Sequence, residues 1–300
     1  MALRVWIWLL SLSVLWGGSF FFAKVAIGEL GPFTVVFGRV ALAALALNIA
    51  LALSGQSLFR SDTPWRTYLV IGFLNNALPF SLIFWGQTQI ASGLASIINS
   101  TTPIFTVLVA HVLTTDEKLT GGKIVALLAG LAGVAVLVGP DIAGRALSGS
   151  WGQIACLGAA LSYAFAGIYG RRFRTMGITP MAAAGGQLSA STILILPIML
   201  IVDRPWTLPA LPSPVIWAAL TGLALLSTAL AYVLYFRILA AAGATNLLLV
   251  TLPLPVTAIL LGAAVLGEQL QPRHFAGMAL IAIGLAAIDG RIWVFLRPAK

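Results

Sequence analysis

Charged residues are scarce in this sequence. Asp, Glu, Lys and Arg make up only 8% of the 300 residues, whereas 60% are hydrophobic, and the mean hydropathy is +1.03. A soluble chain carries about 25% charged residues, so this composition excludes a soluble domain. It predicts an all-α membrane protein, because helices satisfy their own backbone hydrogen bonds inside lipid.

Residues that build disulfides, metal sites and catalytic centres are equally scarce. The single cysteine, Cys156, cannot form an intrachain disulfide. The two histidines, His111 and His274, lie far apart in the sequence and offer no metal-ligand cluster. No nucleophile–base pair can be assembled for a membrane enzyme. We therefore expect no enzymatic activity, no metal and no cofactor.

Carboxylates are missing from the middle of every long apolar run. The acids, each at or near the end of a run, are Glu29, Asp62, Asp116, Glu117, Asp141, Asp203, Glu268 and Asp289. A proton relay is expected to place an acid at mid-membrane, so this absence favours a facilitator or a relay through other groups. Glu117 and Glu268 are the remaining groups that could titrate during transport.

The apolar runs predict ten transmembrane helices, at about 20 residues for each crossing. They cover residues 5–27, 32–53, 66–86, 92–114, 122–138, 151–170, 179–201, 213–236, 243–266 and 274–296. Most of the 17 Lys and Arg residues fall in the connections on one side of this arrangement. The positive-inside rule explains this bias better than nucleic-acid binding does, and it predicts that both termini are cytoplasmic.

A repeat covers nearly the whole chain. The segment from Gly93 to Glu117 recurs from Gly243 to Glu268, each with a proline ten positions after its glycine. We therefore divide the chain into a first repeat, residues 1–140, and a second repeat, residues 151–296. Each repeat holds five spans, an odd number, so the second is predicted to be inverted in the membrane. Inverted repeats place the substrate site between the halves, near the midplane.

Three features together resemble a known family: LWGGSFFFAK at residues 15–24, Arg39 in the second span, and the paired glycine–proline–glutamate segments. They are similar to the drug/metabolite transporter superfamily, in its ten-helix branch of paired EamA domains. Within it the chain looks most like bacterial exporters of amino acids, including aromatic ones. The resemblance implies a bacterial inner-membrane protein that exports amino acids or related metabolites by alternating access. Proton-coupled drug or metabolite efflux and a channel-like pore are the alternatives.

Polar and aromatic side chains inside the spans are the candidate substrate-binding residues. They are Trp16, Phe20, Arg39, Asn75, Asn76, Pro79, Ser96, Asn99, Pro103, Tyr163, Gln187, Tyr232, Tyr235, Asn246 and Pro253. Amides and hydroxyls in hydrocarbon need partners or water, and the two prolines at matching places would kink their helices. Arg39 either faces the interior as a functional group or snorkels to the outer interface.

Overall fold

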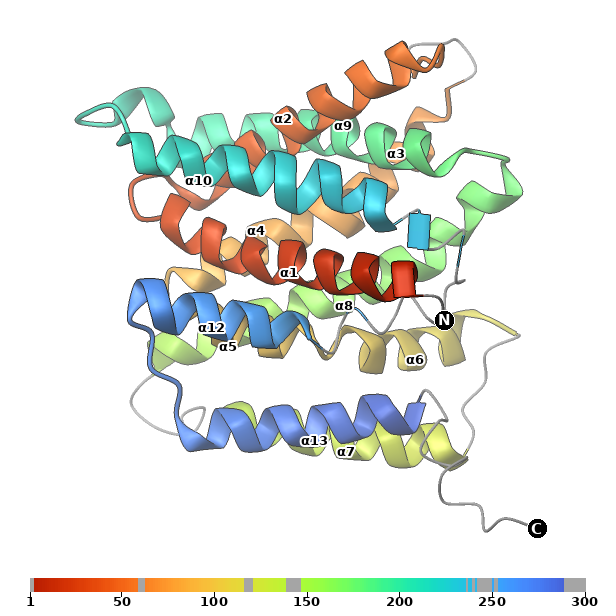
Figure 1. Ribbon diagram of the computed structural model, residues 1–300, viewed down its shortest axis with the longest axis vertical. Coiled ribbons are helices and arrows are strands. Elements are labelled where there is room, and N and C mark those ends of the chain that lie inside the picture. Colours follow the sequence, from red (N-terminus) through yellow and green to blue (C-terminus); the bar gives the residue numbers. More distant parts are fainter. Residues whose placement is uncertain are drawn as a thin grey trace.

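The computed structural model describes residues 3–58, 63–115, 121–138, 147–235, 237–238, 241, 250 and 253–288. Every regular element in these ranges is helical. Helices joined by loops run across the bundle in alternating directions, whereas α3 continues into α4 and α5 into α6 in the same direction, and α13 ends at the side of the bundle at which α1 begins (Figure 1). The all-helical prediction is therefore confirmed for the part of the chain that the structure describes.

Two sets of helices follow the two halves of the sequence. The first is α1 (Leu3–Ala26), α2 (Pro32–Leu53), α3 (Trp65–Gly72), η1 (Phe73–Ala77), α4 (Leu78–Gln87), α5 (Ser92–Asn99), α6 (Thr102–Leu113) and α7 (Gly121–Val138). The second is α8 (Leu147–Thr175), α9 (Pro180–Ile198), η3 (Met199–Asp203), η4 (Pro205–Thr207), α10 (Pro214–Ala224), η5 (Leu225–Leu230), α12 (Leu254–Leu266) and α13 (Pro272–Ile288).

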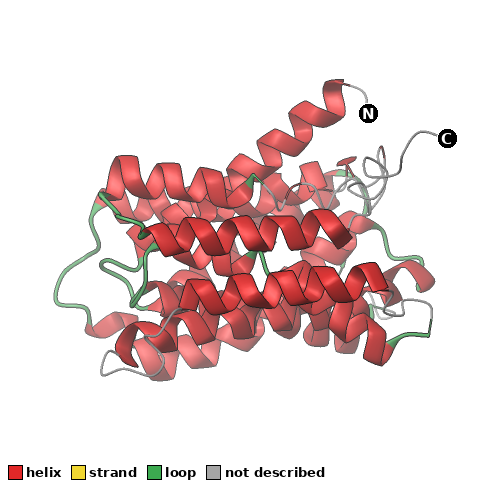
Figure 2. Cartoon of the chain, turned by 90° about the horizontal axis from the view of Figure 1, so that it is seen from below, coloured by secondary structure: helices red, strands yellow, loops and turns green. Residues whose placement is uncertain are grey.

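Seven described segments are long and apolar enough to cross a membrane. They are Leu3–Ala26, Pro32–Leu53, Trp65–Gln87, Ser92–Leu113, Ser150–Thr175, Pro180–Thr207 and Pro214–Tyr235. Large apolar side chains lie on the outside of the bundle, including Leu45, Ile193 and Leu260, each more than half exposed. Short loops connect most of the helices (Figure 2). An apolar surface of this kind fits burial in lipid.

The two prolines in the matched segments each begin a new helix. The fourth predicted span is divided, because α5 ends at Asn99 and α6 starts at Thr102 with Pro103 in its first turn. Pro253 is the residue just before α12. Proline is accepted at a helix start because its missing N–H needs no partner there. The kink expected at Pro103 is thus a short interruption, with Ser100 and Thr101 between the two helices, and Pro253 lies at the start of α12.

Contacts between helices connect the two halves throughout the bundle. The contacting pairs include α7 with α13, α2 with α9, α5 with α12, α4 and α6 with α8, α1 with α10 and α12, α3 with α9, and α2 with α10. At Gly17 the approach is backbone to backbone, since a Cβ there would lie 2.6 Å from the carbonyl oxygen of Leu254. Small residues permit such close contact between membrane helices.

Candidate functional site

Arg39 is buried inside the bundle, with 6% of its surface exposed. Its Nε donates a 3.0 Å hydrogen bond to Thr228 Oγ1, and its Cζ lies 3.7 Å from the ring centroid of Phe80. Neither partner is an acid. The side chain therefore does not snorkel to the surface, and a buried cation is held by a hydroxyl and an aromatic face.

An amide cluster joins η1 to α9 and to the helical segment that follows η5. Asn75 Nδ2 donates to Gln187 Oε1 at 2.8 Å, and Asn76 Nδ2 donates to Ser191 Oγ at 3.2 Å. The hydroxyl of Tyr232 lies 3.4 Å from the side-chain amides of Asn75, Gln187 and Asn76. Both adjacent asparagines therefore point into the bundle, and this pairing offsets the cost of placing amides in hydrocarbon.

Aromatic rings join these two groups. Tyr232 and Tyr235 meet edge to face at 6.5 Å, and Tyr235 lies 5.9 Å from Trp16. On the other side Phe80 contacts Tyr163 at 6.5 Å. Thr228, the hydrogen-bond partner of Arg39, lies four residues before Tyr232 in the same helical segment. The result is one continuous polar and aromatic cluster, from Trp16 through the tyrosines to Arg39, which we call the central cluster.

Two π-helical turns position this cluster. The turn η1 carries Asn75 and Asn76, and η5 carries Thr228, whose hydroxyl also donates to the Leu223 carbonyl at 2.9 Å. A π-helical turn rotates the following side chains relative to an α-helix and is frequent at functional sites. Each turn thereby directs polar side chains toward the interior.

The remaining candidates lie apart from the central cluster. Ser96 Oγ donates to the Gly93 carbonyl oxygen of its own helix at 2.6 Å, and Asn99 Oδ1 is buried without a hydrogen bond from any described residue. Pro79 is buried at the start of α4, and Pro103 and Pro253 mark helix starts. Phe20, with 5% exposure, belongs to the apolar core beside the cluster. Asn246 lies outside the described residues.

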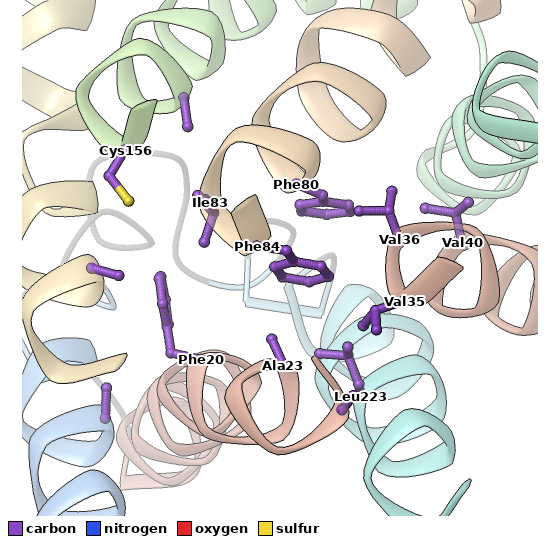
Figure 3. Close-up of a cluster of buried hydrophobic side chains, with 14 of the residues drawn as sticks. Phe20, Ala23, Val35, Val36, Val40, Phe80, Ile83, Phe84, Cys156 and Leu223 are labelled. Carbon is purple, nitrogen blue, oxygen red and sulfur yellow. The ribbon is translucent and has the colours of Figure 1, made fainter. Parts of the chain in front are cut away.

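Three contributors were not anticipated from the sequence: Phe80, Ser191 and Thr228. Ser191 and Thr228 resemble ordinary hydroxyls that bond back to their own helix, as both also do. Phe80 looks like a core residue and packs with Phe84 at 6.2 Å, as seen in Figure 3. The spacing of Ser191, one turn after Gln187, was the one available signal.

Comparisons with known proteins agree with this architecture. The model of the EamA-like transporter family matches the chain twice, at residues 3–139 and 150–288. An uncharacterized inner membrane transporter, YedA of Escherichia coli (strain K12), is 29% identical over 300 residues, covering 97% of this chain and 92% of the relative.

Other relatives extend over similar lengths. An uncharacterized transporter of Bacillus subtilis, YoaV, is 25% identical over 285 residues, covering 94% of this chain and 95% of its own. The protein PecM of Dickeya dadantii is 26% identical over 286 residues, covering 95% of this chain and 92% of its own. A solved crystal structure superposes with a TM-score of 0.66 at 19% identity, covering 95% of this chain and 96% of the other. At that identity the likeness concerns the fold alone.

Proposed function

Because the chain belongs to the EamA-like transporter family, we propose that it exports amino acids or related small metabolites by alternating access, as a facilitator. It is a multi-pass membrane transporter with an inner-membrane relative. Substrate, direction and mechanism are our proposal. The observation that carries it is a buried arginine with no described acidic partner, at the centre of an aromatic and amide cluster.

The proposed architecture is ten spans in two inverted repeats of five. In support, several contacts recur when each helix is exchanged for its counterpart in the other half. The contact of α6 with α8 becomes that of α1 with α12, and the contact of η1 with α9 becomes that of η5 with α2. Likewise α3 with α9 becomes α2 with α10, while α2–α9, α5–α12 and α7–α13 join counterparts directly. A two-fold relation of this kind is typical of inverted-repeat transporters.

Polar contacts follow the same exchange. The sequence repeat aligns Arg39 with Gln187. Arg39 bonds to Thr228 in η5, and Gln187 bonds to Asn75 in η1. Equivalent positions of α2 and α9 thus place a cation, Arg39, and an amide, Gln187, in the interior of the bundle. A zwitterionic substrate presents a carboxylate and a donor, which suit such an asymmetric pair.

In the proposed mechanism, Arg39 holds the substrate carboxylate through a charge-assisted hydrogen bond. The tyrosine and amide groups contact the rest of the substrate, and the rings of Trp16 and Phe80 supply apolar area. Since the predicted spans have no acid at their middle, the cycle needs no protonation of a carboxylate. Net flux then follows the substrate gradient.

Counterflow into proteoliposomes, against a panel of amino acids, tests this function. We expect exchange that persists after a protonophore collapses the pH gradient, and that is lost in Arg39→Gln. If the protein instead concentrates substrate on a pH gradient, and loses that ability in Glu117→Gln or Glu268→Gln, it is a proton-coupled transporter. Unsaturable flux would point to a pore.

Topology is tested separately by single-cysteine labelling in a Cys156→Ala background. Cysteines at Lys118 and Lys123 should label from the cytoplasm, and one at Arg273 from the opposite side. If all three label from the same side, the second half is not inverted.

A further inference from the structure

Three carboxylates join the two halves at one end of the bundle, and each bonds to the start of a helix from the other half. Glu29 accepts hydrogen bonds from Ser213 N and Oγ, both at 2.7 Å, just before α10. Asp203 accepts from Thr34 N at 2.6 Å and Thr34 Oγ1 at 2.9 Å in the first turn of α2. We call these contacts, with the one that follows, the carboxylate caps.

The third cap is made by Glu268, after α12. It accepts from Ser92 N at 2.7 Å, Ser92 Oγ at 2.8 Å and Gly93 N at 3.2 Å, at the start of α5. Lys24 interacts electrostatically with this carboxylate, and it donates to the carbonyl oxygens of Gln87 and Ile90 at the end of α4. Negative charge at a helix start and positive charge at a helix end are both favourable.

All three caps lie at the same end of the bundle. The helix ends that carry them are at the left of Figure 1, opposite the start of α1. At Gly31 the contact is so close that a Cβ would overlap the Asp203 carboxylate. The caps therefore hold the two halves together at this face through oriented charge–amide contacts, and any movement that separates the halves here must break them.

An apolar layer lies beneath the caps, formed by Phe20, Ala23, Val35, Phe84 and Leu223. Each has at most 5% of its surface exposed, and Figure 3 shows these side chains converging from four helices. Along α2 the order is cap, apolar layer, central cluster: Thr34, then Val35, then Arg39 one turn later. The same order runs from Ser213 through Leu223 to Thr228.

The apolar layer and the central cluster are in direct contact. Phe84 stacks on Phe80 with ring centroids 6.2 Å apart and planes 8° apart. The guanidinium carbon of Arg39 lies 3.7 Å from the Phe80 ring and 5.7 Å from the Phe84 ring. A substrate that binds Arg39 thus competes with contacts that hold Phe84 in the layer.

We propose that the carboxylate caps and the apolar layer form the gate on this face of the transporter, and that it is closed in this structure. The inference rests on the proposed alternating-access function. Opening requires release of Glu29, Asp203 and Glu268 from the helices of the other half, and binding at Arg39 favours it through Phe80 and Phe84. The carboxylates act as hydrogen-bond acceptors, so no proton transfer is needed.

The test measures access through the layer without requiring the substrate to be known. A reporter cysteine at Ala23, in the Cys156→Ala background, is labelled by a membrane-impermeant maleimide added at this face. We expect slow labelling that rises on the order of fivefold in Asp203→Ala, because loss of an N-cap changes an equilibrium by about that factor. In the double variant, Asp203→Ala with Glu268→Ala, the increase in labelling rate should equal the product of the increases in the two single variants.

Two controls separate gating from general loosening. Asp203→Asn keeps a capping oxygen and should restore slow labelling. Thr179→Ala removes a cap at the opposite end, where Thr179 Oγ1 accepts from Ala182 N at 3.3 Å, and should leave labelling unchanged. If the Ala23→Cys protein does not fold, Leu223→Cys serves as the reporter in its place.

Unchanged labelling in the double variant, or an equal rise in Thr179→Ala, would overturn the gate. If labelling responds as expected but no amino acid shows counterflow, the gate stands and the proposed substrate class is wrong. The two proposals can therefore fail independently.

Discussion

The central carbon of the Arg39 guanidinium lies 3.7 Å from the ring centroid of Phe80. Phe80 and Thr228, which Arg39 contacts here, are both uncharged. The positive charge of Arg39 can therefore still attract an anionic group. The cation–π contact also orients the planar guanidinium. In the proposed mechanism, Arg39 and Phe80 form the point at which the substrate carboxylate and the apolar layer meet.

Arg39→Gln should weaken transport by about 10- to 100-fold in apparent substrate affinity, because a hydrogen bond to a charged group contributes roughly 1.5–3 kcal/mol. Arg39→Lys keeps the charge but loses the planar contact, and should retain part of the activity. Thr228→Val is the matched control that removes the Nε partner alone. Concentration-dependent counterflow measures all three, and an unaffected Arg39→Gln would remove this residue from the site.

Tyr232→Phe deletes a hydroxyl that lies within hydrogen-bond distance of three amides. We expect a higher KM with a similar maximal rate, and a stability loss of about 0.5–1.5 kcal/mol per hydrogen bond lost. Tyr235→Phe, one turn along the same helix, should have the smaller effect on KM. Equal effects in both variants would mean that the amide contacts of Tyr232 do not serve substrate binding.

Trp16→Ala should reduce transport by far more than it reduces the amount of folded protein. The ring is only partly buried and meets Tyr235 at 5.9 Å, and in the proposed mechanism it contacts the substrate. Loss of a fully packed aromatic would cost about 3–5 kcal/mol. Parallel loss of folded protein and activity, read by size-exclusion chromatography and counterflow, would identify Trp16 as a packing residue.

Gly17→Ala should destabilise the protein by about 1–3 kcal/mol, the usual cost of overpacking. The added Cβ would lie 2.6 Å from both the Leu254 carbonyl oxygen and Thr257 Cβ. Gly167→Ala is the matched control, because nothing lies within 4 Å of a Cβ there and alanine favours a helix by about 1 kcal/mol. Thermal unfolding in detergent should move in opposite directions for the two variants.

The cap made by Glu29 should be lost only in acid. Hydrogen bonds from Ser213, first its backbone N–H and then its hydroxyl, hold the pKa of Glu29 below its ordinary value. A lowered pKa in the folded protein means that the contribution to stability is present above the ordinary value, about 4.3, and disappears as pH falls through the lowered one. Wild type and Glu29→Gln should thus differ in thermal stability at pH 7 and converge below about pH 4. A constant difference across that range would contradict the assignment.

Much of the candidate site could be predicted because polar residues in apolar spans are conspicuous. Asn75, Gln187 and Tyr232 were each unusual in their own span, and the structure brings them together. Ser96 was equally conspicuous, yet it bonds to its own helix. A hydroxyl can satisfy itself locally whereas a primary amide or guanidinium seldom can, so the larger polar groups gave the more reliable predictions.

The sequence by itself determined that this is a helical membrane protein, where most helices begin and end, and that the two matched prolines disturb their spans. These are local properties, since hydropathy, chain length per crossing and the steric demands of proline act within one segment. Only the tertiary structure decided that Arg39 turns inward to Thr228 and Phe80. It also decided that Glu29, Asp203 and Glu268, which looked like ordinary acids at span ends, cap helices of the other half. The first N–H groups of any helix lack partners within that helix. Which carboxylate accepts their hydrogen bonds is therefore decided by how the two halves pack.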